Sequence, residues 1–198
     1  MKGLWIPTIE IESSAGSREI TLYSRHLSNR TIFIQGEINE DVANAVLVQL
    51  MYLQNEGTED INLYINSPGG IVTSGLMIYD LIQSIETPVN MFCTAIAGSM
   101  AAVILAGGQK GRRFILPHSK TMIHEPLLAS GLGGSATSIK NIADSILETR
   151  TLINNILAKH TGKTVEEINE ATSFDHFMNA EESVQFGICD EIRNNIFS

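Results

Sequence analysis

The alternation of strand-like and helix-like segments over the first 110 residues restricts the fold of this chain more than any other feature. Short runs rich in β-branched and apolar residues predict strands at 31–36, 61–67 and 89–96. Apolar residues at helical spacing predict helices at about 40–54, 73–85 and 99–105. Strands that alternate with helices form βα units, so the pattern predicts an α/β domain.

The remainder of the chain predicts one domain with a small appendage. Two short strands are expected at 112–117 and 120–124, followed by a long helix at about 136–159. Thr164 with Glu167 matches a capping box, and Asn179 with Glu182 suggests one more helix start. A length of 198 residues suits a single core. We therefore expect a mobile N-terminal arm at 1–18 and one domain at 19–198.

Charge and cysteine usage exclude several classes of partner. A formal net charge of -9 argues against nucleic acid or an anionic membrane as the main partner. The basic cluster at 110–113 is expected to be a solvated turn. Cys93 and Cys189 show no metal spacing and fit a reducing compartment. Residues 1–12 do not match a secretory signal, and no apolar run is long enough to span a membrane, so a cytoplasmic location is expected.

Two turns from strand to helix carry serines. One contains Ser67 and is followed by Pro68-Gly69-Gly70, and the other contains Gly98-Ser99. Backbone N–H groups at such turns are unpaired, and with the helix dipole they can stabilise an oxyanion. Either serine could instead simply cap its helix. Ser99 is the better candidate nucleophile, because small neighbours leave room for a substrate and apolar flanks exclude water.

A serine hydroxyl needs a base, and a triad also needs a carboxylate. The chain offers five histidines. His124 ends an apolar run and precedes Glu125-Pro126, which would hold an imidazole at the rim of a core, whereas His160 sits at the end of a helix. A satisfied core histidine is an equally simple interpretation of His124. For the carboxylate, the residues alone do not choose between Asp175 and, for example, Asp144.

A glycine-rich run at 131–136 fits the dinucleotide fingerprint GxGxxG/A and precedes a helix. It lacks a preceding strand of its own βαβ unit and an acidic residue at the end of a second strand about 20 positions later. The run at 107–111 is not a P-loop, because its lysine precedes the last glycine. No metal-ligand spacing is present. We therefore expect neither a cofactor nor a metal.

Several motifs occur together in a family order and spacing. They are YSR at 23–25, YINSPGG at 64–70, SM at 99–100, MIHEP at 122–126, and FM, AEE and FG within 177–187. In this combination the chain resembles the family of Clp protease proteolytic subunits (ClpP). The resemblance covers about residues 20–192, nearly the whole chain.

The resemblance implies a ClpP/crotonase-like spiral of ββα units with a protruding handle helix at about 127–160. It implies a serine endopeptidase with Ser99 as nucleophile, His124 as general base and Asp175 as the acid. The backbone N–H groups of Gly70 and Met100 would form the oxyanion hole. Peptide would bind as an added strand along four residues, which are Ile71, Val72, Leu127 and Leu128.

The resemblance also implies partners. The family forms two seven-membered rings face to face, built here from identical or related subunits, and the glycine-rich 127–135 stretch with the following helix would make the ring–ring contact. An AAA+ unfoldase would feed polypeptide into the chamber, and the subunit itself would bind no ATP. The unfoldase would dock at four positions, which are Asn62, Tyr64, Ser84 and Phe114. Asn62 and Ser84 replace common aromatic residues there, which leaves less apolar surface to bury.

One departure from the family leaves alternatives open. Ser173 and Phe174 stand where the family usually has an acidic–Arg pair before the catalytic aspartate. An active peptidase is the first interpretation, and a poorly active ring subunit that needs a related subunit or an unfoldase is the second. A crotonase-like acyl-CoA enzyme is the third, and the Ser/His/Asp set and the few clustered cations disfavour it.

Overall fold

The computed structural model describes residues 7–13, 16–127 and 134–196, and its centre is a seven-stranded, mostly parallel sheet. The strands run β3-β4-β5-β6-β9, with β7 parallel to β5 and β8 antiparallel to β7. Their bounds are β3 Thr31–Ile38, β4 Ile61–Gly70, β5 Val89–Gly98, β6 Arg113–Ile115, β7 Lys120–Ile123, β8 His176–Met178 and β9 Glu191–Ile192. The α/β class expected from the sequence is confirmed.

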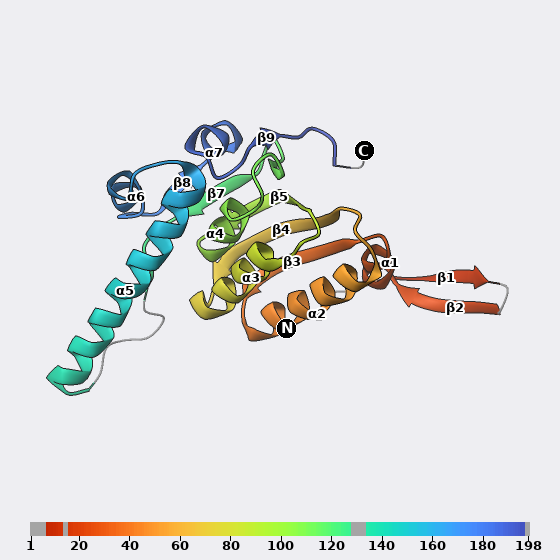
Figure 1. Ribbon diagram of the computed structural model, residues 1–198, viewed down its shortest axis with the longest axis horizontal. Helices are drawn as coiled ribbons and strands as arrows, with labels where there is room; N and C mark the ends of the chain where they lie inside the picture. The colour runs from red at the N-terminus through yellow and green to blue at the C-terminus, as the bar shows by residue number, and fades with distance from the viewer. Residues whose placement is uncertain (1–6, 14–15, 128–133, 197–198) are drawn as a thin grey trace.

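Helices cover this sheet and extend beyond it (Figure 1). Their bounds are α1 Leu22–Ser28, α2 Glu40–Glu56, α3 Val72–Ser84, α4 Met100–Ala106, α5 Ala136–Thr161, α6 Val165–Ala171 and α7 Ala180–Phe186. Every residue of α4 is buried, and α4 contacts α3, α5, β4 and β5. The most apolar helix therefore lies at the centre of the core, directly after the Gly98-Ser99 turn.

Local signals explain where most helices begin and end. Asn39 caps α2 by accepting a hydrogen bond from the Val42 N–H, and Gly162 ends α5 in the left-handed conformation. The two capping boxes expected from the sequence, Thr164 with Glu167 and Asn179 with Glu182, are both present and begin α6 and α7. These boundaries were predictable because the interactions span only three or four residues.

The structure also contains elements that sequence periodicity did not predict. The expected N-terminal arm contains an antiparallel hairpin of β1 (Thr8–Ser13) and β2 (Gly16–Thr21), and α1 follows directly. The short strands β8 and β9 exist only through pairing with β7 and β6. Strands of two or three residues carry no periodicity of their own, so they depend on partners distant in sequence.

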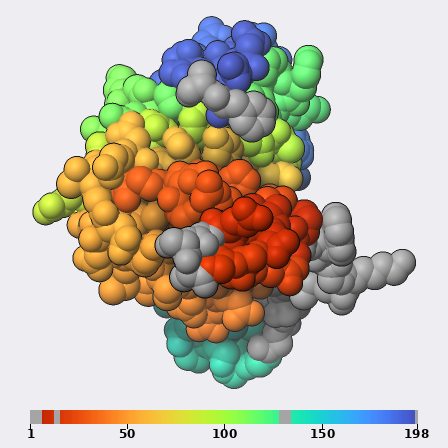
Figure 2. All heavy atoms as spheres, turned by 90° about the vertical axis from the view of Figure 1, so that its right-hand side faces the viewer, coloured from red at the N-terminus to blue at the C-terminus, as the bar shows by residue number. Residues whose placement is uncertain are grey.

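Two elements project from opposite sides of the body (Figure 1). One is the β1–β2 hairpin, whose spheres lie in front of the orange part of the chain when it is viewed from that end (Figure 2). The other is α5, which has two unlike halves. Ile153, Ile156 and Leu157 are buried, whereas Ile139 and Leu147 are exposed. Among the helices of the described residues, none is long and apolar enough to cross a membrane.

A buried arginine joins the chain's C-terminal strand to the centre of the molecule. Arg113 is 3% exposed and pairs with Asp190, at 2.9 Å from Nε to Oδ2. Its Nη1 also donates to the carbonyls of Ala106, His160 and Gly187. The prediction of a solvated basic turn at 110–113 is therefore wrong for Arg113. Burial needs a partner carboxylate, and that carboxylate lies 77 positions away.

Asp190→Asn should lower the free energy of unfolding by roughly 3 kcal/mol at pH 7, because it leaves the Arg113 guanidinium buried without its counter-ion. Burial alone would raise the pKa of Asp190, but the hydrogen bonds and charge of Arg113 outweigh it and hold this pKa below 3.8. The carboxylate therefore contributes its full stabilisation at pH values above 3.8, and this contribution is lost as the pH falls through the lowered pKa of Asp190.

Urea denaturation of wild type and Asp190→Asn at pH 7 and at decreasing pH measures this contribution. The difference between the two proteins should narrow in acid. The matched control is Asp144→Asn, which removes an exposed carboxylate 3.8 Å from Lys140 and should change stability by less than about 0.5 kcal/mol. Equal effects of the two substitutions would contradict the assignment.

Candidate active site

The carboxyl ends of β4 and β5 approach so closely that only glycine fits between them. A Cβ on Gly69 would lie 2.6 Å from Ser99 Cβ and 2.7 Å from the Gly98 carbonyl oxygen, and Gly69 has φ +99. A Cβ on Gly98 would in turn lie 2.8 Å from the Pro68 carbonyl oxygen. The two turns singled out from the sequence therefore form one site, at the strand ends where open α/β sheets bind ligands.

The two serines in these turns have different surroundings. Ser67 is fully buried, and its Oγ accepts a hydrogen bond from the Gly69 N–H at 3.1 Å, which stabilises the turn. Ser99 is half-buried at the N-terminus of α4, but its side chain makes no capping hydrogen bond. Neither serine therefore caps its helix, since Ile71 stands at the N-cap of α3 without a side-chain bond, and the Ser99 hydroxyl is left for another partner.

The backbone of Ser99 is held in a conformation that favours glycine. It has φ 51 and ψ -124, and its N–H donates to the Met122 carbonyl at 2.7 Å. A non-glycine residue at positive φ stores strain, and such residues cluster at functional sites. The hydrogen bond to β7 fixes the serine against the strand that ends one residue before His124.

A histidine meets this serine. His124 Nε2 lies 2.9 Å from Ser99 Oγ, and the imidazole is 14% exposed. On the other side of the ring, Nδ1 lies 3.7 Å from Asp175 Oδ1, just beyond hydrogen-bond length. Asp175 is 65% exposed, and Nδ1 has no hydrogen-bond partner among the described residues. The structure thus brings the three residues proposed from the sequence together, with His124 between Ser99 and Asp175.

Strand pairing brings Asp175 to this place. Ile123 on β7 pairs with His176 on β8, so the residues next to His124 and Asp175 face each other across the two strands. The alternative carboxylate, Asp144, lies on the exposed half of α5 and pairs with Lys140 instead. Sequence periodicity did not select Asp175, because the strand that places it, β8, is only three residues long and has no recognisable pattern of its own.

Gly70 and Met100, the expected oxyanion donors, directly follow Gly69 and Ser99 in the two turns. The Ile71 N–H donates to the Ile38 carbonyl at 2.8 Å. Because successive N–H groups of a strand point to opposite sides, that of Gly70 faces away from β3. Met100 follows Ser99, and a Cβ on Gly69 would lie 3.0 Å from its nitrogen. The Met100 nitrogen thus lies against the Gly69 turn, one residue after Ser99.

An apolar pocket opens beside Ser99 and His124. Its other lining residues are Val72, Met100, Val103, Ile123, Pro126, Ile153 and Leu157. Of the four residues expected to bind peptide, Val72 lines this pocket, while Ile71 and Leu127 are 50% and 73% exposed. Leu128 lies outside the described residues. The surface beside the serine thus offers an apolar pocket, and two of the expected peptide-binding residues are exposed.

The four expected docking residues do not form one cluster. Tyr64 stacks between Phe33 and Phe92, and Phe92 contacts Phe114, in a row across four adjacent strands. The C-terminal segment covers this row, since Tyr64 Oη donates to the Ile196 carbonyl and Arg193 lies over the Phe114 ring. Asn62 bonds Asn90 beside the row, whereas Ser84 ends α3 and bonds the Leu81 carbonyl.

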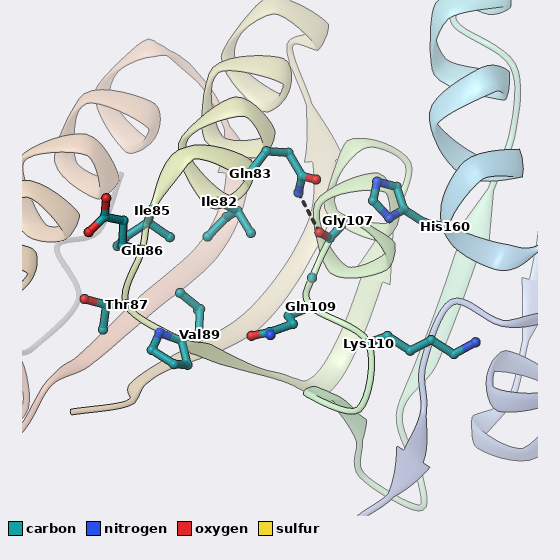
Figure 3. Close-up of a pocket in the computed structure, with 12 residues that line it drawn as sticks. Ile82, Gln83, Ile85, Glu86, Thr87, Val89, Gly107, Gln109, Lys110 and His160 are labelled. Carbon is teal, nitrogen blue, oxygen red and sulfur yellow. Dashed lines mark hydrogen bonds between the residues drawn. The ribbon is translucent and has the colours of Figure 1, made fainter. Parts of the chain in front are cut away.

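A second pocket lies away from the serine, between the end of α3 and the loop after α4 (Figure 3). It contains His160, whose Nε2 lies 2.8 Å from Tyr79 Oη. Burial, with the nearby charges of Lys159 and Arg113, holds the pKa of His160 below 6.5. His160 is thus engaged by Tyr79, and the pocket contains none of the candidate catalytic residues. In the part of the chain that the structure describes, no cluster of His, Cys, Asp and Glu could hold a metal ion.

Gly69→Ala should lower the reactivity of Ser99 toward a serine-directed fluorophosphonate by at least about 100-fold. The new methyl group overlaps the Ser99 side chain and the Gly98 carbonyl, and a shift of about 1 Å in a reacting group costs roughly that factor. The control is Gly162→Ala, which also has positive φ, +76, but has nothing within 4 Å of the added Cβ. An equal loss of Ser99 labelling in both variants would contradict the role of the Gly69 contact, because it would show that backbone strain alone lowers the labelling.

Comparison with known proteins agrees with the motifs in this site. The family model described as Clp protease matches residues 14–195. The chain is 45% identical over 191 residues to the ATP-dependent Clp protease proteolytic subunit of Ligilactobacillus salivarius (strain UCC118), covering 96% of each sequence. The family match spans β2, the sheet and the long helix together.

Proposed function

The chain belongs to the Clp protease family and is a serine peptidase, and we propose that Ser99, His124 and Asp175 form its catalytic triad. The contact that carries the proposal is the 2.9 Å approach of His124 Nε2 to Ser99 Oγ. A serine hydroxyl becomes an effective nucleophile only when a base lies within hydrogen-bond distance and can accept its proton. The family membership also excludes the acyl-CoA enzyme considered above.

The reaction follows from these positions. His124 Nε2 accepts the Ser99 Oγ proton as Oγ attacks the peptide carbonyl, and the N–H groups of Gly70 and Met100 bind the resulting oxyanion. The protonated imidazole then donates to the leaving amine nitrogen, which releases the first product and leaves an acyl-enzyme. Water, deprotonated by the same Nε2, hydrolyses the ester and restores Ser99.

Asp175 supports the imidazole in this scheme. A carboxylate at Nδ1 selects the tautomer with its proton on Nδ1 and stabilises the imidazolium that forms. The 3.7 Å separation needs only a small movement of the exposed carboxylate to become a hydrogen bond. Because β8 pairs with β7, such a movement is confined to the few residues between α6 and β8.

Replacing Ser99 with Ala should abolish cleavage of short fluorogenic peptides, with a loss of at least about 10³-fold in kcat. Asp175→Asn should lower kcat by up to about 10⁴-fold, since the amide favours the wrong tautomer of His124. Peptide cleavage and phosphonate labelling, with the particle size recorded, test this. A matched control is Asp60→Asn, which removes a surface carboxylate paired with Arg112 and should keep wild-type activity. Wild-type rates in Ser99→Ala would overturn the assignment.

A second function is favoured by the same 3.7 Å distance. With Asp175 65% exposed and beyond bonding distance of His124, the chain could act as a ring subunit of low intrinsic activity that a related subunit or an unfoldase completes. The wild-type measurement separates the two. Cleavage by the purified chain supports the self-sufficient peptidase, and cleavage only after adding a related subunit or a Clp ATPase supports the second function.

The substrate is unfolded polypeptide bound as an added strand. Ile71 and Val72 on one side, with Leu127 and Leu128 on the other, supply main-chain groups that recognise any sequence. The pocket beside Ser99 would receive the side chain that precedes the cleaved bond. Since its lining is apolar, this side chain should be apolar as well.

Peptides with Leu before the cleaved bond should have a kcat/KM at least about 10-fold above otherwise identical peptides with Asp. The two side chains are similar in size, but the carboxylate would be buried without a partner. Asn at the same place is the matched neutral control and should fall between them. Equal rates for all three peptides would show that this pocket does not receive the substrate.

Assembly and partner binding complete the proposal. Two stacked seven-membered rings would bury the exposed Ile139 and Leu147 of α5, as the protruding half of a handle requires. An AAA+ unfoldase would dock near Asn62, Tyr64, Ser84 and Phe114. Sedimentation of the purified chain tests the assembly, and binding of a Clp ATPase tests the docking.

A further inference from the structure

One face of α5 contacts both chain segments that carry the proposed base and acid. Glu125 directly follows the base, His124, and Thr172 lies three residues before the acid, Asp175. Arg150 and Asn154 lie four residues apart on α5, hence on the same side of the helix. Each of them meets one of the two segments.

Glu125, in the segment that carries the base, contacts both α5 and the segment that carries the acid. Its Oε2 lies 3.2 Å from Arg150 Nε, and its backbone N–H donates to the Thr172 carbonyl at 2.8 Å. The Arg150 Nε–H is not aligned as a hydrogen bond, so charge holds this pair. The residue after the base is thus tied by its side chain to α5 and by its backbone to the acid segment.

The contact between Asn154, on the same helix face, and Thr172 is fully buried. Asn154 is 0% exposed, and its Nδ2 donates to Asn169 Oδ1 at 2.7 Å and to Thr172 Oγ1 at 3.3 Å. Thr172 is also 0% exposed, and its hydroxyl donates to the Ile168 carbonyl at 2.8 Å. Thr172 therefore has a fixed position, and its carbonyl gives Glu125 a rigid anchor.

The ion pair between Arg150 and Glu125, unlike the Asn154 contacts, is partly exposed to solvent. The side chains of Arg150 and Glu125 are 31% and 43% exposed, and pairs this accessible contribute little to stability. Its effect should be on geometry, because it sets the direction of the chain one residue after His124. Catalytic rate is far more sensitive than stability to a displacement of the base relative to Ser99 Oγ.

We propose that Glu125 is a positioning residue, whose ion pair with Arg150 ties the segment carrying His124 to the long helix α5. The inference rests on the proposed triad. It makes α5 a mechanical link, since a change in the seating of this helix alters the His124 position through Arg150. No bond to substrate is involved, so Glu125 acts on the reaction only through the imidazole beside it.

The test compares Glu125→Gln, Arg150→Met and the double variant with wild type, using peptide cleavage and the rate of Ser99 phosphonylation. Each single variant should lower kcat and the phosphonylation rate by roughly three- to tenfold with KM within twofold. The double variant should be no slower than the slower single variant, because both remove one interaction. The midpoint of thermal unfolding and the particle size should not change.

The control is Asp60→Asn, which breaks the ion pair of Asp60 with Arg112, whose side chains are 45% and 30% exposed, and should leave kcat unchanged. Wild-type kcat in Glu125→Gln, additive losses in the double variant, or losses that follow thermal stability would each overturn the inference while leaving the triad intact. Absence of Ser99-dependent cleavage and labelling in the wild type, even after a related subunit or a Clp ATPase is added, would overturn the triad itself, and the inference with it.

Discussion

The close approach of two strand ends is the constraint on which the rest of the site depends. With no side chain on Gly69 or Gly98, the turn after β4 lies directly against the turn after β5, and Ser99 takes a positive φ that its neighbours impose. A single methyl group on Gly69 would occupy the place of the serine side chain. The strain at Ser99 is held by its N–H bond to Met122 and by the buried helix α4 that follows. Packing of the core therefore holds the nucleophile, so its own hydroxyl makes no structural bond and stays free to react.

The same design separates structural polar groups from reactive ones. Ser67 and Thr172 are fully buried and bonded within the protein, and Arg113 is buried against Asp190. The reactive groups differ, because Ser99 is half-buried, His124 has one nitrogen without a hydrogen bond in the described structure, and Asp175 is exposed. Satisfied buried groups give rigidity, whereas partly satisfied groups at the rim keep the freedom that proton transfer requires.

Helix α5 connects this site to the outside of the molecule. Its second half packs on the core through Ile153 and Leu157, both of which line the pocket beside Ser99. Its first half projects from the body with Ile139 and Leu147 exposed (Figure 1). A helix transmits displacement along its axis because its backbone is continuously hydrogen-bonded. Contacts made by the projecting half would thereby act on the pocket, on Glu125 through Arg150, and on the acid segment through Asn154.

The sequence by itself determined what depends on neighbouring residues. The alternation of strands and helices, the caps of α6 and α7, and the pairing of a small-residue turn with Ser99 all arise from interactions within a few positions. Comparison of motifs, rather than pattern alone, selected Asp175 over Asp144. Only the tertiary structure decided that Ser67 braces its turn while Ser99 faces His124, that Arg113 is buried, and that β8 brings Asp175 beside the imidazole. The Ser67 bond spans two positions, but the Ser99–His124 and Arg113–Asp190 contacts join residues 25 and 77 positions apart. Their meeting is set by packing of the whole core, so local sequence carries no signal for these contacts.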